Sequence, residues 1–173
     1  MICRTAFLMS PTQATSAFIP AVAKGSLTTA PQSTIIRPTP SLSHGSPFKR
    51  TSEVIFDEIE TEARTWYGTK YHHKGRVKGV GVDCGGFMYE LFKPFLSLPP
   101  FPNYPEDWAM HRENEIFLSF LMPFVEEVDT PSHGTVTMFK FGRNYGHSAF
   151  MMKDGRYIHA WGGGYQGSVQ IDH

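Results

Sequence analysis

The order of the hydrophobic patterns along the chain predicts an α+β fold, with helices first and an antiparallel sheet after them. Between residues 51 and 122 apolar side chains recur at helical spacing, whereas from residue 135 onward short apolar segments are bounded by Gly and Asn. The length of 173 residues suits one domain with a tail. We therefore expect a domain over residues 51–173 and a separate leader over residues 1–50.

The leader is rich in Ser, Thr, Pro and Ala and shows neither helical nor strand periodicity. We predict that it is disordered, because it has too little apolar surface to offset the entropy of ordering. It contains basic residues but no Asp or Glu, which is compatible with an organelle transit peptide, a linker or a start codon assigned too far upstream. The apolar segment at residues 5–9 is too short and poorly flanked for a convincing signal peptide.

Charge and cysteine content exclude several functions. Five of the 16 Lys and Arg residues lie in the first 52 positions, whereas all 16 acidic residues lie in 53–173, so the domain is net negative. A nucleic-acid groove would need clustered basic residues, and no apolar run approaches the roughly 18 residues that cross a membrane. We expect neither partner. The two cysteines, Cys3 in the leader and Cys84 in the domain, do not form a disulfide framework.

Residues 51–67 are predicted to form the first helix. Thr51 or Ser52 can cap it, and acidic residues occupy its N-terminal half, where the helix dipole favours them. Gly68 is well placed to end it. One apolar stripe is formed by Ile55, Ile59, Ala63 and Trp66. We assign this helix a packing role and no chemistry.

The loop over residues 69–82 carries His72 and His73 among basic residues. Neighbouring side chains rarely point at one ion, and no spaced carboxylate or second cysteine completes a ligand set. We therefore expect no metal and no other cofactor. The basic residues are expected on a solvated face or at the rim of a substrate site.

A glycine-rich segment, residues 79–87, leads into the second predicted helix, which runs to about Phe92. Asp83 is expected to cap this helix, which places Cys84 in its first turn. The positive end of the helix dipole favours a thiolate there, so we expect the pKa of Cys84 below its usual ~8.5. This segment alone leaves two interpretations open: Cys84 is a nucleophile, or it is a small buried thiol packed among glycines.

The remaining elements follow from turn residues and periodicity. Five prolines make residues 94–106 a stiff surface loop that could wall a cleft, and residues 107–122 are predicted to form a third helix, capped by Asp107 and stopped by Pro123. Four strands are predicted after it: Thr135–Phe141, His147–Met152, Arg156–Trp161 and Gly167–Ile171.

The turn between the second and third of these strands decides whether His147 and His159 can cooperate. A two-residue turn at positions 154–155 pairs residue 150 with 159 and puts the histidines on opposite faces. A three-residue loop at positions 153–155 pairs 149 with 159 and makes the histidines diagonal neighbours, about 7–8 Å apart, on one face. Gly155 suits the left-handed third position of that loop. We expect the three-residue loop, although the Asp-Gly dipeptide alone favours the other register.

In that register the chain contains a Cys-His-His set. Cys84 would be the nucleophile, His147 would take its proton and later protonate the leaving amine, and His159 would fix the tautomer of His147. The N–H of Cys84 is a natural oxyanion donor. The alternative is that both histidines are ordinary sheet residues hydrogen-bonded to backbone, which is the commoner situation for an isolated pair.

Four short segments carry these residues: Gly68–Tyr71, Gly81–Gly86, Gly146–Ala149 and Arg156–Ala160. Together they resemble the patterns G-x-P-Y, D-C-S-G, H-x-x-I and F-I-H-A of the NlpC/p60 family of cysteine peptidases. Three further segments are similar, more narrowly, to the tail-associated members encoded by phages and prophages: residues 75–84, 104–108 and 139–143. The resemblance covers about residues 53–165.

The resemblance implies a papain-like α+β fold in which a cysteine at a helix N-terminus faces histidines on a small antiparallel sheet. Carried over by motif, Cys84 matches the nucleophile, His147 the base and His159 the third polar residue. Tyr71 matches the tyrosine that borders the site and helps to position substrate or to bind the oxyanion. Asp83 matches the aspartate before the nucleophile, which implies a contact with substrate in addition to the helix cap.

The implied activity is hydrolysis of an amide bond in the peptide stems of bacterial peptidoglycan, commonly at D-γ-glutamyl–diamino acid links. A tail component of this kind would be found in the phage virion or in a bacterium that produces a prophage. It would act in the periplasm or cell wall, either loosening the wall during DNA entry or serving tail assembly. Its implied partners are stem peptides and other tail proteins.

Two alternatives belong to other classes. The chain could be a catalytically inactive structural or wall-binding tail protein, which thiol reactivity would distinguish from an active peptidase. It could also be an acyltransferase on the same fold, with an acyl channel lined by Phe95, Leu96, Leu98 and Phe101.

The chain also departs from the family pattern. Lys70 replaces the usual proline and Gly85 the common serine, and the chain ends 14 residues after His159, where family members usually continue through further strands. We therefore expect a sheet with C-terminal strands truncated and one edge open, as in a mis-bounded reading frame.

Overall fold

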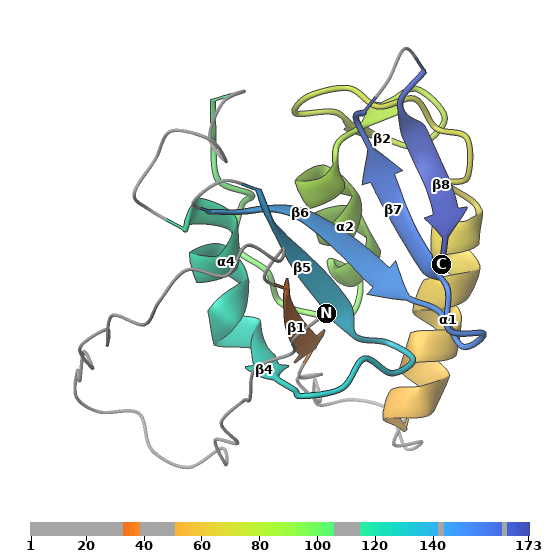
Figure 1. Cartoon of the computed structure of the whole chain (residues 1–173), viewed down its shortest axis with the longest axis vertical. Coiled ribbons are helices and arrows are strands. Elements are labelled where there is room, and N and C mark those ends of the chain that lie inside the picture. Colours follow the sequence, from red (N-terminus) through yellow and green to blue (C-terminus); the bar gives the residue numbers. More distant parts are fainter. Residues whose placement is uncertain (1–32, 39–50, 106–114, 142–143, 164–165) are drawn as a thin grey trace.

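The computed structural model describes residues 33–38, 51–105, 115–141, 144–163 and 166–173. The α+β class is confirmed, because helices pack against an antiparallel sheet of six strands (Figure 1). The sheet has the order β4-β1-β5-β6-β7-β8, and a separate two-stranded sheet is formed by β2 (Arg76–Val77) and β3 (Gly81–Val82).

Helix α1 (Ser52–Arg64) begins where the sequence predicts. Thr51 is its N-cap, and the Thr51 hydroxyl accepts a hydrogen bond from the N–H of Val54 at 3.4 Å. The predicted apolar stripe is buried, with Ile59 and Ala63 at 1 % and 0 % exposure. The polar face of α1 holds the turn between two strands of the sheet, because Glu60 accepts a hydrogen bond from the backbone N–H of Lys153 at 2.8 Å.

Helix α2 (Cys84–Phe92) is the central helix of the domain and packs against β6 (Asn144–Met151) and β7 (Tyr157–Trp161) (Figure 1). All of its residues except Glu90 are buried. The core around α2 consists of aromatic and aliphatic side chains from the α1 segment, from α2 and from the sheet. Among them are Trp66, Phe87, Leu91, Phe92, Phe150 and Ile158. The N-terminus of α2 is therefore held rigidly against the sheet.

The register of the β6–β7 hairpin is the predicted one. Phe150 pairs with Ile158 and Met151 with Tyr157, so residues 153–155 form the three-residue loop. Gly155 has a φ of +81°, the left-handed conformation that the third loop position needs. This register puts His147 and His159 on the same face of the sheet.

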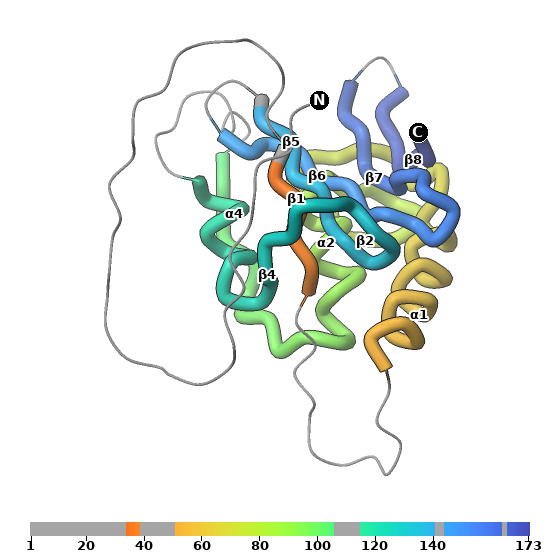
Figure 2. Tube along the Cα trace, turned by 60° about the horizontal axis from the view of Figure 1, so that its bottom comes forward, coloured from red at the N-terminus to blue at the C-terminus, as the bar shows by residue number. Residues whose placement is uncertain are grey.

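The prediction of disorder throughout the leader is wrong for residues 33–38. They form β1 (Ser33–Pro38), which lies between β4 (Val125–Glu127) and β5 (Val136–Phe141) and pairs antiparallel with both (Figure 2). Ile35 and Ile36 are 4 % and 0 % exposed. Two adjacent isoleucines supply too little local pattern to mark a strand, but β4 and β5 provide backbone partners on both sides, and the side chains on both faces are buried.

At the other end of the sheet, β8 (Ser168–Asp172) pairs with β7 from Tyr157–Asp172 to Trp161–Ser168. The strand predicted at Gly167–Ile171 is therefore present, shifted by one residue. The last residue of β8, Asp172, belongs to the candidate active site described below. In the described part of the chain β8 is the last strand at this end of the six-stranded sheet, where the open edge was expected, and β1 and β4 extend the sheet at the other end.

The third predicted helix is shorter in its described part. Helix α4 (Ile116–Leu121) is followed by a 3-10 turn, Met122–Phe124, which contains Pro123. The predicted cap Asp107 and the rest of residues 107–114 lie outside the described residues. No helix in the described part of the chain is long and apolar enough to cross a membrane.

Candidate active site at the start of helix α2

The start of α2 is fixed by Asp83, as predicted. Asp83 has an extended backbone, and its Oδ1 accepts a hydrogen bond from the N–H of Gly86 at 2.7 Å, which caps the helix and makes Cys84 its first residue. The Cys84 Sγ donates to the carbonyl of Gly146 at 3.7 Å, and the Ser148 hydroxyl donates to the carbonyl of Cys84 at 3.3 Å. The cysteine is therefore bonded to the residues on both sides of His147.

The two predicted histidines are in direct contact. His147 Nε2 lies 2.7 Å from His159 Nδ1, and the two side chains are largely buried, at 6 % and 9 % residue exposure. The structure thus brings together Cys84, His147 and His159 from three separate segments of the chain.

Sequence reasoning missed a fourth member of this set, Asp172. Its Oδ2 lies 2.9 Å from His159 Nε2 and also accepts a hydrogen bond from Gln170 Nε2 at 2.9 Å. These hydrogen bonds lower the pKa of Asp172, with that from His159 the largest favourable contribution. The feature that identifies Asp172 is the register of β8. Residue 170 pairs with residue 159, so residue 172 is a diagonal neighbour of His159.

The chain of hydrogen bonds also assigns the tautomers of the neutral rings. A carboxylate accepts only, so His159 carries its proton on Nε2 and presents an unprotonated Nδ1 to His147. His147 then carries its proton on Nε2 and keeps a basic lone pair on Nδ1. Asp172 therefore determines, through His159, which nitrogen of His147 can act as a base.

The pKa of Cys84 differs from the sequence expectation. Burial, and next the negative charge of Asp83, raise the pKa of the thiol to about 12. The expected lowering by the helix dipole is wrong for this structure, because Cys84 is only 6 % exposed and the residue that caps the helix places a carboxylate beside it. Burial, and next the proximity of His159, lower the pKa of His147 to about 3. At neutral pH the site holds a neutral thiol beside a neutral imidazole.

Asp83 is buried at 2 % exposure with both oxygens hydrogen-bonded within the chain. Besides the bond to Gly86, its Oδ2 accepts from the N–H of Lys74 at 2.7 Å and from the Tyr104 hydroxyl. Burial, and next the charge of Asp83, raise the pKa of Tyr104. Tyr104 is a second residue that sequence reasoning missed, because nothing in a proline-rich loop indicates a bond to a distant helix cap. The contact of Asp83 with substrate stays a prediction.

Tyr71 lies in the same neighbourhood. Its backbone N–H donates to the carbonyl of Gly167 at 2.7 Å, and its ring packs so closely on Gly162 that an added Cβ there would lie 2.8 Å from the ring. Tyr71 also forms an isolated parallel β-bridge with Val82, two residues before Cys84. Its role in positioning substrate stays a prediction.

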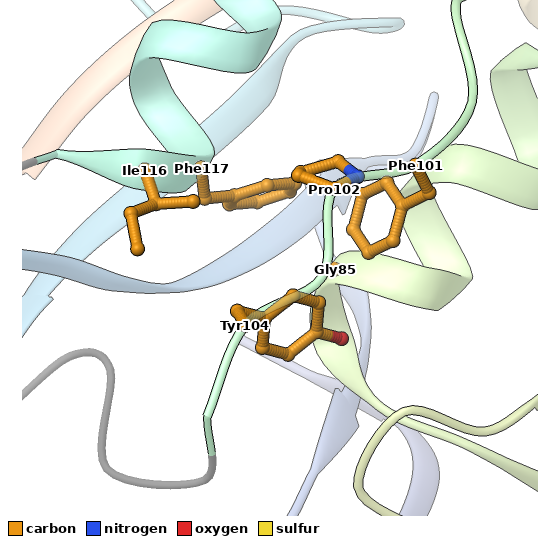
Figure 3. Close-up of a pocket in the computed structure, with 6 residues that line it drawn as sticks. All are labelled: Gly85, Phe101, Pro102, Tyr104, Ile116 and Phe117. Carbon is orange, nitrogen blue, oxygen red and sulfur yellow. The ribbon is translucent and has the colours of Figure 1, made fainter.

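An apolar pocket lies at Gly85, the residue after Cys84 (Figure 3). It is narrow, with about 10 Å³ accessible to water, and its lining consists of Gly85, Phe101, Pro102, Tyr104, Ile116 and Phe117. The proline-rich loop thus walls this pocket. The acyl channel expected from Phe95, Leu96, Leu98 and Phe101 is divided in the described part of the chain: Phe101 lines this pocket, whereas Leu96 and Leu98 line a different one beside β1.

The rings of the adjacent residues His72 and His73 contact different groups. His73 Nδ1 lies 3.8 Å from Asp83 Oδ2, and the His72 ring bonds to the carbonyl of His73 at 2.9 Å. Among the described residues, no group of three or more His, Cys, Asp or Glu side chains could hold a metal ion.

Comparison of this chain with protein-family models, with curated proteins and with solved structures gives no match.

Proposed function

We propose that this protein is a thiol-dependent hydrolase of the NlpC/p60 type, which cleaves an amide bond in the stem peptides of bacterial peptidoglycan. The observation that carries the proposal is the hydrogen-bonded series His147–His159–Asp172 beside a cysteine at a helix N-terminus. A packing role alone does not require two buried histidines aligned on a carboxylate. The assignment of the substrate rests on the resemblance of the four motif segments.

The neutral ground state favours general-base catalysis over a preformed thiolate–imidazolium pair. As Cys84 Sγ bonds to the substrate carbonyl carbon, His147 Nδ1 takes the thiol proton, and the charge that develops on the imidazole is stabilised through His159 by Asp172. The backbone N–H of Cys84, which has no partner within the helix at this first position, is suited to the oxyanion.

The second half of the reaction uses the same groups. His147 gives its proton to the leaving amine as the C–N bond breaks, which leaves a thioester on Cys84. Water then attacks the thioester while His147 again takes a proton. The carboxylic acid product leaves and the proton returns to Sγ. No step requires a metal or another cofactor.

A papain-like NlpC fold and a place in a phage tail belong to the same proposal. In its support, the predicted Cys helix and the predicted His hairpin occur where the family pattern requires them. Strand β1 lies outside the four motif segments, so its addition to the sheet does not alter them.

The decisive experiment is a digest of purified peptidoglycan and soluble stem peptides, read by mass spectrometry. We expect new stem-peptide fragments with the wild type that persist in EDTA and are absent with Cys84→Ala and His147→Ala. Cys3→Ala is the matched control, because it removes the other thiol of the chain, and it should retain activity. A folded wild-type protein that yields no fragments contradicts the peptidase proposal.

One observation favours a second candidate, an inactive structural or wall-binding tail protein. The Cys84 thiol is buried and its pKa is raised to about 12, which is the state of an unreactive thiol. Alkylation of the folded protein at neutral pH distinguishes the two. A rate for Cys84 that stays far below that of Cys3, even with stem peptide present, favours the structural protein.

A further inference from the structure

A second hollow lies on the other side of the proline-rich wall of the apolar pocket. It is lined by Lys74, Arg76 and residues 101–104 and has a volume of about 230 Å³, far larger than the apolar pocket. The two pockets share Phe101, Pro102 and Tyr104. Because Tyr104 bonds to Asp83 and Gly85 lines the apolar pocket, both hollows adjoin the residues that flank Cys84.

The two basic side chains of this hollow have no ion-pair partner among the described residues. Two other exposed lysines do: Lys78 pairs with Glu62 at 2.8 Å, and Lys153 pairs with Asp57 at 3.2 Å. The domain as a whole carries more acidic than basic residues. Within the part of the chain that the structure describes, two cations without an ion-pair partner therefore line one concave site, in a domain that is net negative.

Both basic residues are anchored to the first turn of α2. The Arg76 guanidinium carbon lies 5.5 Å and 5.9 Å from the ring centres of Tyr89 and Phe101, and its Cγ lies so close to Gly86 that an added Cβ there would be 2.8 Å away. Lys74, with a φ of +59°, is held by the hydrogen bond from its N–H to Asp83. The Arg76 side chain and the Lys74 backbone are thus held beside the residues that flank Cys84.

We propose that the hollow lined by Lys74 and Arg76 binds a free carboxylate of the peptide substrate. This proposal rests on the proposed function and specifies its substrate as an acidic peptide. The planar guanidinium of Arg76, whose carbon lies over the Tyr89 and Phe101 rings, can form two parallel hydrogen bonds with a carboxylate, and the ammonium of Lys74 adds a point charge. Phe101 and Tyr104 would separate this carboxylate from the apolar pocket beside Gly85.

Binding is tested without catalysis, by titrating the full chain with N-acetylglutamic acid and following the side-chain Nε resonance of each arginine by NMR. We expect a saturable shift of the Arg76 signal with the diacid and none with its diamide. The dissociation constant should rise about five- to tenfold in Arg76→Gln and in Lys74→Gln, and less in Arg76→Lys, which retains the charge but not the planar fork. Lys153→Gln is the matched control and should change the constant less than twofold.

Three results would overturn the carboxylate site. The first is an equal shift of the Arg76 signal with the diacid and the diamide, and the second is a loss of affinity in Lys153→Gln equal to that in Arg76→Gln. The third is tighter binding of inorganic phosphate than of the diacid, which would indicate a phosphate site. The amide spectrum of each variant shows whether it is folded, and two separate variants protect the test from a folding failure in one.

The link to the peptidase is tested with paired substrates that carry a free or an amidated carboxylate. We expect Arg76→Gln to raise KM about five- to tenfold for the acidic peptide, with kcat unchanged, and to leave the KM of the amidated peptide unaltered. A wild type that binds N-acetylglutamic acid at Arg76 but cleaves neither peptide contradicts the proposed function alone. A wild type that cleaves both peptides with equal KM contradicts the carboxylate site alone.

Discussion

Acidification should destabilise this protein specifically through His147. In the folded chain its pKa is lowered to about 3, whereas an unfolded histidine titrates at ~6.5. Between these values the unfolded state binds one more proton than the folded state, so stability is fully present above pH ~6.5 and is lost as the pH falls toward 3. At ~1.36 kcal/mol per pKa unit, lowering the pH from 7 to 4 should cost about 3 kcal/mol at this one site.

Urea denaturation at pH 7 and at pH 4 measures this cost in the wild type and in His147→Gln. The variant should be less stable at pH 7, because it loses the bond to His159, but its further loss at pH 4 should be smaller than that of the wild type by about 3 kcal/mol. His72→Gln, at an exposed histidine, serves as the control and should retain the wild-type loss. Equal pH-dependent losses in wild type and His147→Gln would refute a buried neutral imidazole at this position.

Three further substitutions test the geometry. Gly86→Ala should destabilise the fold by about 3 kcal/mol or more in urea denaturation, because the added Cβ would lie 2.5 Å from the carbonyl oxygen of Gly75. The control Gly68→Ala should cost only about 1 kcal/mol, because Gly68 has a φ of +79° but no atom within 4 Å of an added Cβ. Similar costs for the two variants would contradict the close approach at Gly86. Ile36→Ala should cost about 2–5 kcal/mol, since the side chain is fully buried, whereas a cost near zero would place residues 33–38 outside the sheet. Asp172→Asn should lower kcat in the peptide digest about 10- to 100-fold with little change in stability. This loss is smaller than the ~10⁴-fold typical of a buried triad aspartate, because the Asp172 side chain is 53 % exposed. An unchanged kcat would show that Asp172 does not set the tautomers of His159 and His147.

The local features of the site were predictable because they depend on neighbouring residues. Asp83 caps α2 through a bond that spans three residues, and Gly155 adopts the left-handed conformation that selects the loop length. Once that loop is fixed, the period of the strands alone places His147 and His159 on one face. The helix start and the histidine pair therefore follow from short-range rules.

Three features could not be read locally. Residues 33–38 form a strand only because β4 and β5 lie on either side of it, a pairing between segments about 100 residues apart. Asp172 reaches His159 only through the register of β7 and β8, and Tyr104 reaches Asp83 across the helix start. In each case the partner is chosen by packing and not by sequence neighbours.

The sequence by itself determined the order of helices first and four C-terminal strands after them, the position of Cys84 at a helix start and the shared face of the two histidines, because capping, turn geometry and strand period act over a few residues. Only the tertiary structure decided the charge state of the site. The helix dipole alone predicts a lowered pKa for Cys84, but the packed fold excludes water and sets the Asp83 carboxylate beside the thiol, and both raise the pKa to about 12. Desolvation depends on everything that surrounds a group, so it appears only once the whole chain has folded.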